Sequence, residues 1–447
     1  MNFLFITADD MNWDAVGAFG CPVPAVTPNL DRLASQGIRF RHAHVTAAVC
    51  QPSREVMMTG RYPHRNGGMG FEPIWDHIDT LQERLHKAGY LNGILGKVTH
   101  LAPIDRFKWD MQQDIQDLGC GRDPQKYAAF ARQFLAQAKE TSRPFFLMAN
   151  AHDPHRPFVG SEQEAARFGE AVSAIPKPSA VFRPEDITVP GFLPDIPDVR
   201  LEVAQYYNSC RRCDDTVGAL LEELDASGMA DDTIVMFLSD NGMAFPFSKT
   251  NCYLNSTRTP WIVRWPGVTP SGVLDETHFI SGIDVTPTIL DLAGLENIDD
   301  ADGRSFTDIL RGQTDNERDC VFTVFHKTSA GTEYPMCGIQ TWQHGYIFNA
   351  WSDGTTEFKN ESQSGLTFRA MDAAAAEDPV IARRVHNFRY RTPEELYDFE
   401  QDPNALNNLI DDPNMADRLS AFRQQLHNWM QEGDYPLSSS YHARFLS

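Results

Sequence analysis

Phe3-Leu4-Phe5-Ile6-Thr7-Ala8-Asp9-Asp10 is the stretch from which the fold of this chain can be inferred. An uncharged run that ends in two adjacent carboxylates is typical of a strand buried on both faces of a sheet. The pattern recurs in Leu91–Leu95 before Gly96-Lys97-Val98-Thr99-His100, in Pro144–Ala149 before His152-Asp153-Pro154-His155, and in Thr233–Leu238 before Ser239-Asp240-Asn241-Gly242. In parallel sheets, ligands bind at the carboxyl ends of the strands. We therefore expect these polar clusters to meet at one edge of a mostly parallel sheet.

Helical periodicity alternates with these runs. The predicted helices are Asn29–Gln36, Thr80–Ala88, Lys126–Ala138 and a long one from about Asp198 to Ser227, and Glu276–Leu295 reads as a further strand–helix unit. Such alternation predicts an α/β fold in which helices sandwich the sheet.

The pattern changes beyond about residue 316. Val321–Phe325, Gly338–Thr341 and Gly345–Ala350 read as shorter strands of an antiparallel sheet, followed by Glu394–Asp398 and a helix near Ala416–Met430. We predict a catalytic domain over residues 1–315 and a smaller C-terminal α+β domain over residues 316–447.

The composition is that of a globular protein with a large core: 447 residues, 42% hydrophobic and 22% charged. The net charge of −22 argues against a nucleic-acid or anionic-membrane partner, and it requires any anion site to be locally basic. No apolar run is long enough to span a bilayer. The uncharged N-terminal stretch lacks a basic region and leads directly into Asp9, so it reads as a buried strand rather than a signal peptide. We expect a cytoplasmic protein, with a trimmed export signal as the alternative.

The eight cysteines are dispersed through the chain and do not imply a disulfide framework. Cys210 and Cys213 have the spacing of a redox or metal-binding pair. They lie inside a helical pattern without a second pair nearby, so ordinary buried helix positions are the preferred interpretation.

Asp9, Asp10, Asp240 and Asn241 follow two of the predicted strands and offer only oxygen ligands. Such a donor set favours Ca²⁺ or Mg²⁺, with Mn²⁺ as a further option, over Zn²⁺.

Cys50-Gln51-Pro52-Ser53-Arg54 places a basic side chain four residues after a cysteine. If a helix begins near Pro52, Arg54 lies in its first turn, and the helix N-terminus adds N–H donors to an anion site. Lys97, His100 and Lys249 would supply further charge or donors, and His152 is a candidate general acid. Taken singly, each would be an ordinary surface or core residue.

Together, Thr27–Ala34, Cys50–Arg54 and Met58–Arg61 resemble the type I sulfatase family of the alkaline phosphatase superfamily. Gly96-Lys97, Ser239–Gly242 and Asp284–Thr288 continue the resemblance over essentially the whole chain. It implies an alkaline-phosphatase-like fold and one divalent cation, with Ca²⁺ as the preferred ion. It also implies a maturation enzyme that oxidises Cys50 to Cα-formylglycine.

The resemblance also assigns roles. The metal ligands would be Asp9, Asp10, Asp240, Asn241 and the formylglycine at 50; the residues that bind sulfate and move protons would be Arg54, Lys97, His100, His152 and Lys249. One spacing departs from the commoner pattern, because two residues separate Lys97 from His100 where many members have one.

Within the family, the segment from His152 to Arg156 and the segment from Asp240 to Pro246 resemble those of the sulfamidase (heparan N-sulfatase) branch. This implies a hydrolase that releases sulfate from a sulfated amino sugar such as N-sulfoglucosamine. His155 and Arg156 are then candidates for sugar contacts, with a purely structural role equally open. His326, Lys327 and Glu333 are weaker candidates for an outer subsite.

Three alternatives stay open from the sequence. The enzyme could be an O-sulfatase or arylsulfatase, or a phosphonate monoester or phosphodiester hydrolase on the same scaffold. A non-catalytic protein that binds sulfated glycans would need Cys50 to remain a thiol. The sequence decides neither N- versus O-linkage nor whether the chain forms a homo-oligomer.

Overall fold

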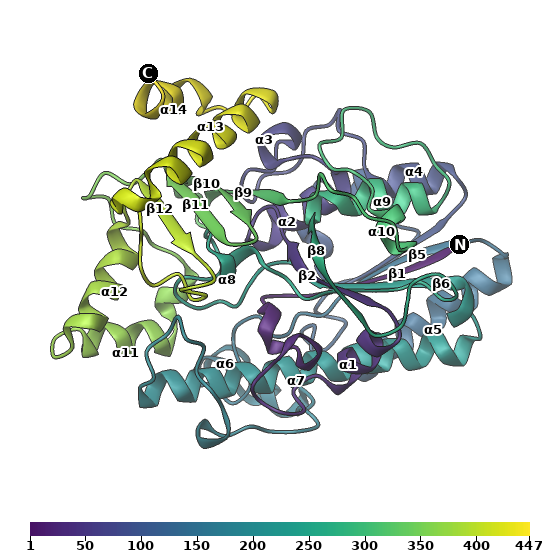
Figure 1. Ribbon diagram of the computed structural model, residues 1–447. Helices are drawn as coiled ribbons and strands as arrows, with labels where there is room; N and C mark the ends of the chain where they lie inside the picture. The colour runs from purple at the N-terminus through teal and green to yellow at the C-terminus, as the bar shows by residue number, and fades with distance from the viewer.

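The computed structural model describes residues 1–447 and contains two sheets, which lie side by side (Figure 1). In spatial order, the eight-stranded sheet comprises β4 (Met111–Gln113), β3 (Leu91–Leu95), β5 (Phe145–Asn150), β1 (Asn2–Ala8), β6 (Thr233–Ser239), β7 (Trp261–Arg264), β2 (Ile38–His44) and β8 (Val273–Ser281). Only β7 runs antiparallel to its neighbours. The predicted mostly parallel sheet is therefore confirmed.

The register of the central strands explains why their polar ends meet. Strand β1 pairs in parallel with β5 on one side and β6 on the other; Thr7 lies opposite Asn150 and Leu238, and Ala8 opposite Ser239. Because all three strands end at the same level, the residues that follow them emerge at one edge of the sheet.

Helices cover both faces of the large sheet, as Figure 1 shows. One face carries α1 (Pro28–Ser35), α5 (Pro124–Thr141) and α7 (Pro197–Ser227); the other carries α2 (Cys50–Thr59), α4 (Leu81–Lys87), α9 (Val285–Leu292) and α10 (Thr307–Leu310). Strand β1 alternates between them: Leu4 and Ile6 join the first core, Phe3 and Phe5 the second. This two-sided burial is why the strand reads as a continuous apolar run.

Three smaller helices complete the predicted catalytic domain. They are α3 (Pro63–Asn66), α6 (Glu162–Phe168) and α8 (Leu254–Thr257), and α8 among them is buried. The eight cysteines form no disulfide, and Cys210 and Cys213 are buried in the core on α7, as the preferred interpretation of the sequence had it.

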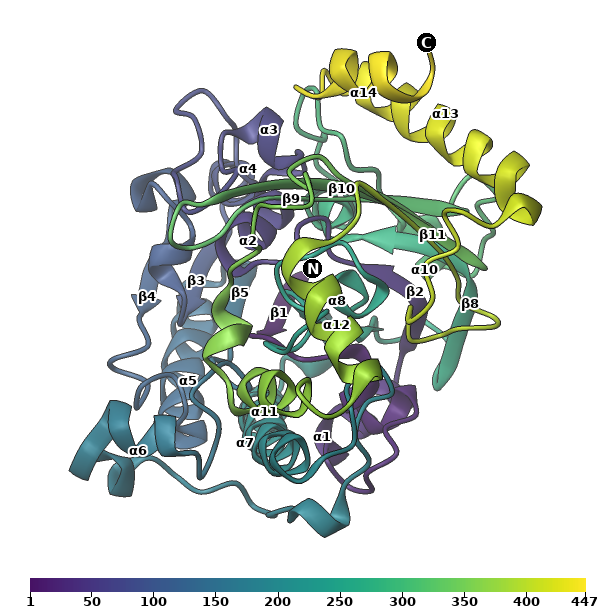
Figure 2. The same cartoon turned by 90° about the vertical axis from the view of Figure 1, so that its left-hand side faces the viewer.

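The small sheet is antiparallel throughout. In spatial order it comprises β12 (Glu394–Asp398), β11 (His344–Asn349), β10 (Glu333–Thr341) and β9 (Cys320–Lys327). One face packs against α13 (Ala416–Glu432) and α14 (Ser438–Phe445). Phe325, Met336 and Ile347 from the sheet join the core shared with α7, α11 (Leu366–Ala374) and α12 (Pro379–Tyr390). Figure 2 shows these two layers on either side of the sheet.

The two sheets are joined just before the cysteine motif. Val324 of β9 donates its backbone N–H to the carbonyl oxygen of Thr46 at 2.8 Å, and an isolated bridge pairs Ala47 with Val324. The small sheet is thus attached to the segment that leads into Cys50. The boundary at 315/316 stays a prediction.

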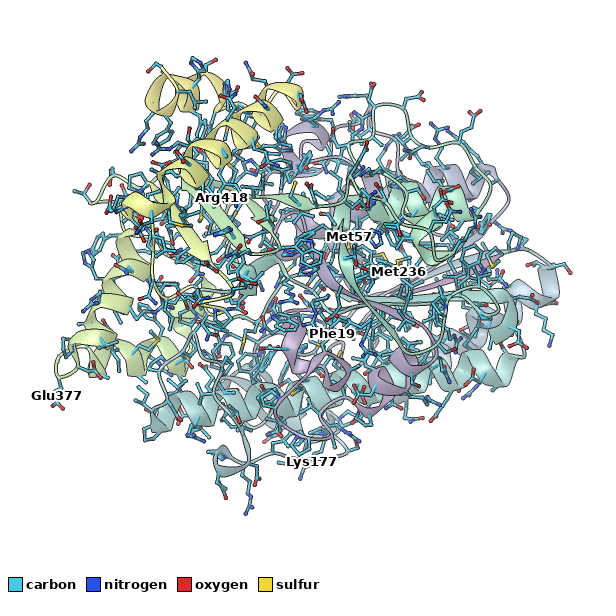
Figure 3. All side chains as sticks on the ribbon, in the orientation of Figure 1. Phe19, Met57, Lys177, Met236, Glu377 and Arg418 are labelled. Atoms are coloured by element: carbon cyan, nitrogen blue, oxygen red, sulfur yellow. The ribbon has the colours of Figure 1, made fainter.

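The interior is filled from both sheets. Figure 3 shows Met57 and Met236 within the molecule and Lys177 and Glu377 at its periphery. No helix combines the length and the apolar character needed to cross a membrane.

Candidate active site

Cys50 is the first residue of α2, directly after the extended Val49. Its side chain is buried, and this burial raises the pKa of the thiol, with the opposing charge of Lys249 too weak to compensate. An unmodified thiol here stays neutral near pH 7 and is a poor nucleophile. The helix N-terminus favours an anion beside residue 50.

Asp9 and Asp10 follow β1, and Asp240 and Asn241 follow β6. Carboxylate oxygens of the three aspartates lie within 4.8 Å of one another. The backbone turns sharply here, since Asp10 has a φ of 71°. This conformation lets two adjacent side chains face one point; the backbone N–H of Asp10 donates to Asp240 Oδ1 at 3.1 Å, and Asn241 Nδ2 donates to Asp10 Oδ1 at 2.7 Å.

Three buried cations face these acids one to one. Arg54 Nη2 donates to Asp240 Oδ2 at 2.6 Å, Lys249 Nζ lies 2.8 Å from Asp10 Oδ1, and Lys97 pairs with Asp9. All six side chains are nearly or completely excluded from solvent. A chain with a net charge of −22 thus gathers three cations at this one place.

The acid cluster fits a divalent cation. Asp9 Oδ1 and Asn241 Oδ1 are buried without any hydrogen-bond donor, which is costly unless something else satisfies them. The donors are all oxygens, the set that hard cations prefer.

The pKa values of Asp9 and Asp240 reflect how closely the charged groups are packed. Burial disfavours the charged form of Asp9, yet Lys97, His155 and His152 hold its pKa well below the usual value. Burial raises the pKa of Asp240 to about 7; Arg54 opposes this shift, and repulsion from Asp9 and Asp10 adds to it. A cation among these oxygens would relieve that repulsion.

The histidines lie on the solvent side of the acids. His152 Nδ1 is 3.4 Å from Asp9 Oδ2, and its ring stacks on that of His155 with centroids 4.9 Å apart. Burial, followed by Lys97, lowers the pKa of His152 well below its usual value. Burial and then Lys97 also lower the pKa of His100, and its ring packs edge-on against Phe71.

The thiol belongs to the same constellation. Ligand atoms of Asp9, Cys50 and His155 lie within 4.8 Å of one another. The structure therefore brings Cys50, the acids, the three cations and His152 and His155 together, with His100 facing the same charges.

Asn150 is a site residue that the sequence analysis missed. Its Oδ1 accepts hydrogen bonds from Arg54 and from Thr7 Oγ1, and its Nδ2 donates to the carbonyl oxygens of Leu95 and Gly96. One amide thereby fixes the arginine relative to β1 and β3. Its signal was present, because the polar Asn150 ends the run of β5.

Gly96 shows why the β3 end tolerates no side chain. With φ of 67°, it would place a Cβ 2.6 Å from the carbonyl oxygen of Asn150. Lys97 follows in the same left-handed region, at φ of 56°. This tight turn directs the ammonium group of Lys97 back toward Asp9.

Glu361 is the second residue that the sequence analysis missed. It comes from a 3₁₀ turn, η9 (Glu361–Ser364), after the small sheet's β11, and its Oε2 accepts from Lys249 Nζ at 3.0 Å. Its Oε1 lies 3.8 Å from His155 Nε2. Burial opposes ionisation, but Lys249 and then His155 lower the pKa of Glu361 to about 2.

Arg156 makes its hydrogen bonds outside the acid cluster. Its Nη1 donates to Glu202 Oε1 at 2.6 Å, and its Nε and Nη2 donate to the carbonyl oxygen of Ala244. The side chain is only 5% exposed. This placement favours the structural role that the sequence left open, and sugar binding by Arg156 stays a prediction.

The outer-subsite candidates line a cavity of about 180 Å³ formed by β9, β10 and the connection between α13 and α14. His326 is buried and hydrogen-bonded to the hydroxyl of Tyr435, and Lys327 Nζ pairs with Glu72 at 2.7 Å. Glu333 lies 3.5 Å from the same ammonium group. Lys327 and Glu333 have side chains 19% and 71% exposed, so they are more accessible to a ligand than the buried His326.

The covered parallel sheet, the oxygen cluster at its strand ends and the buried cations are typical of enzymes that bind a divalent cation and a small anionic group. Comparison with known proteins agrees. The sulfatase family model matches residues 1–295, and a model of the N-sulphoglucosamine sulphohydrolase C-terminal region matches residues 243–355. The chain belongs to the sulfatase family and is a sulfatase.

Individual relatives extend this assignment. The human N-sulphoglucosamine sulphohydrolase is 32% identical over 97% of this chain and 91% of that protein. A solved structure in complex with its substrate D-glucosamine-2-N,6-O-disulfate has a TM-score of 0.71 at 18% identity, covering 97% of this chain and 98% of that one. The phosphonate monoester hydrolase of Agrobacterium radiobacter has a TM-score of 0.69 at 19% identity, covering 97% and 96%. The last two likenesses concern the fold.

Proposed function

We propose that this sulfatase releases sulfate from an N-sulfoglucosamine-like amino sugar, using a Cα-formylglycine at position 50 and one Ca²⁺ ion. The observation that carries the proposal is the meeting of Asp9, Cys50 and His155, with ligand atoms within 4.8 Å. The likeness to N-sulphoglucosamine sulphohydrolase over nearly the whole chain supports the substrate class.

The residues that would hold the ion are Asp9, Asp10, Asp240, Asn241 and the modified residue 50. Their oxygen donors favour Ca²⁺ over softer metals, since Ca²⁺ accepts six to eight oxygens in flexible geometry. When bound, the ion supplies positive charge that lowers the pKa of a nearby hydroxyl group and holds a sulfate oxygen.

The hydrated aldehyde at position 50 would offer one hydroxyl group to attack sulfur and a second to expel sulfate afterwards. Arg54, Lys97 and Lys249 then neutralise the charge of the sulfate oxygens as it redistributes. Their charges are already matched by Asp9, Asp10 and Asp240. A dication would therefore leave the site with net positive charge for an anionic substrate, which the strongly acidic chain otherwise repels.

His152 would protonate the departing nitrogen or oxygen, and His100 would accept the proton from the second hydroxyl group. His152 is 13% exposed, so it is reachable from the side on which a leaving group would lie. Its lowered pKa makes the free imidazole neutral near pH 7. A bound sulfate, being negative, would oppose that shift and favour the protonated acid.

The test is sulfate release from N-sulfoglucosamine beside glucosamine-6-sulfate on one preparation, with residue 50 checked by peptide mass. Release from the N-sulfo sugar alone is the expected result. No release from it while the aldehyde is present would reject the proposed substrate and direct attention to O-sulfates.

A phosphonate monoester hydrolase is the second candidate, because such an enzyme shares the fold. Turnover of a phosphonate monoester above that of any sulfated sugar would favour it. A non-catalytic glycan binder would require an intact thiol at Cys50. The maturation enzyme as a partner, the cytoplasmic location and a homo-oligomer remain predictions.

A further inference from the structure

One carboxylate of the site has no task in the function proposed above. Asp9, Asp10 and Asp240 each face a cation and together surround the candidate metal position. Glu361 lies farther out, between Lys249 at 3.0 Å and His155 at 3.8 Å, and its side chain is 33% exposed, the most open of the site's acids. A buried structural carboxylate would not need this access to solvent.

Several contacts hold Glu361 in this position. Asn360 Nδ2 donates to Thr250 Oγ1 at 2.6 Å, which ties the turn to the residue after Lys249. Glu202 accepts from the backbone N–H groups of Leu366 at 2.8 Å and Thr367 at 2.7 Å, which fixes the start of α11 just beyond the turn.

Arg156 completes this support. It pairs with Glu202 at 2.6 Å, and a Cβ at Gly365 would lie 2.5 Å from Arg156 Nη2. The arginine therefore packs under the backbone that leads from Glu361 into α11. This support gives the buried Arg156–Glu202 ion pair a role, although neither residue contacts the thiol.

Glu361 is linked through His155 to both residue 50 and the proposed acid. His155 shares one cluster with Asp9 and Cys50 and another with Asp10 and Glu361, each with ligand atoms within 4.8 Å. His155 also stacks on His152, the proposed acid. Hence Glu361 lies one side chain away from residue 50. A leaving group protonated by His152 would have its bridging atom near this carboxylate.

That bridging atom differs between the two kinds of substrate. In a sulfamate it is a nitrogen that carries an N–H donor; in a sulfate ester it is an oxygen with lone pairs only. A carboxylate accepts hydrogen bonds and donates none when ionised. We propose that Glu361 selects N-sulfates over O-sulfates by accepting the bridging N–H and repelling an ester oxygen. This inference rests on the proposed function and supplies the linkage preference that the sequence left open.

The test compares N-sulfoglucosamine with glucose 2-sulfate, which differ only in the bridging atom. The quantity is the ratio of kcat/KM for the N-sulfate to that for the O-sulfate. Wild type is expected to favour the N-sulfate, and Glu361→Gln to lower the ratio about tenfold or more, the size expected for a hydrogen bond to a charged group. Glutamine can turn its amide N–H toward an ester oxygen. The variant therefore loses the charged acceptor for the N-sulfate and gains a donor for the O-sulfate.

Glu357→Gln is the matched control. Glu357 lies four residues earlier in the same segment, is 34% exposed and pairs with Arg389. The control variant removes the same charge away from the thiol, and the ratio should stay unchanged.

Three outcomes would overturn the inference. If Glu361→Gln lowered kcat/KM for both substrates by the same factor, Glu361 would only hold Lys249 in place. If added Ca²⁺ restored the variant's activity on both, Glu361 would be a metal ligand with Asp10 and His155. If wild type converted neither sugar, the proposed function would fall first and this inference with it.

Discussion

The two sheets contribute to the site in different ways. The large sheet supplies residues from the ends of parallel strands: Asp9 and Asp10 after β1, His152 after β5, and Asp240 after β6. The small sheet adds no residue of the charged cluster from a strand end. Its region contributes Glu361 to that cluster from a turn beyond β11, while Lys327 and Glu333 line the separate outer cavity.

Strand direction explains the difference. Parallel strands present their carboxyl ends at one edge, so several side chains converge without long loops. Antiparallel strands alternate their ends, and a functional residue must be delivered by a connection and held by contacts of its own. We infer that the large sheet builds the chemistry and the small-sheet region adjusts its selectivity.

Cys50→Ser tests the chemical half of that division and should have the largest effect. A serine has one hydroxyl group, so a sulfated serine at position 50 could not expel sulfate as the proposed hydrated aldehyde would. Steady-state turnover should fall at least about a thousandfold, as for removal of other catalytic nucleophiles. Peptide mass should show sulfate retained on residue 50; sustained turnover by this variant would contradict the mechanism.

Arg54→Ala tests how far the large-sheet site depends on paired charges. Arg54 and Asp240 are fully buried and 2.6 Å apart, so the variant leaves a buried carboxylate unpaired. Removing one partner of such a pair costs about 3–5 kcal/mol of unfolding free energy. Urea denaturation measures this loss, and Arg54→Lys should lose less because it keeps a charge; equal losses would argue against charge pairing.

Removal of the cation should have a smaller effect, also confined to the large-sheet side. A chelator should lower Tm, and Ca²⁺ at about a hundred times its Kd should restore about 2.7 kcal/mol. Differential scanning calorimetry with Ca²⁺ and Mg²⁺ compares the two ions. A Tm indifferent to every divalent cation would show that the acid cluster binds none.

Glu55→Gln addresses an acid of the nucleophile helix that no cation faces. Glu55 is fully buried, its Oε2 has no hydrogen-bond donor, and burial raises its pKa from 4.5 to about 9. The folded state therefore binds a proton that the unfolded state releases, and stability falls as pH rises above the unfolded value. Between about pH 5.5 and 7 the wild type should lose about 2 kcal/mol relative to Glu55→Gln. Denaturation midpoints at the two pH values measure the difference; no pH-dependent difference would show that Glu55 has a partner.

The division between the sheets also decides what the sequence could predict. Runs ending at Asp9, Asp240 and His152 carry a visible pattern, because a strand buried on both faces must be apolar until it leaves the sheet. The sequence predicts a helix that begins near Pro52, and the structure shows it beginning two residues earlier, at Cys50. Asn150 was missed although it ends such a run, because an asparagine in a strand reads as a break.

Glu361 lay beyond sequence reasoning for a physical reason. The turn that carries it has no periodicity, and its place depends on Glu202 in α7, a residue far earlier in the chain. The sequence correctly indicates that Arg156 lies near the site. Its partner Glu202 lies in another part of the chain and cannot be inferred from the segment around Arg156.

The link between Val324 and Thr46 has a consequence for the order of events during synthesis. Residue 50 leaves the ribosome early, whereas its flanking segment gains its partner strand only near residue 324 and its outermost acid only at residue 361. At about 5–20 residues per second, the roughly 300 residues in between take roughly 15–60 s. For that interval the nascent chain cannot have a finished site, and the predicted maturation enzyme would have its longest access to the thiol that the folded protein encloses.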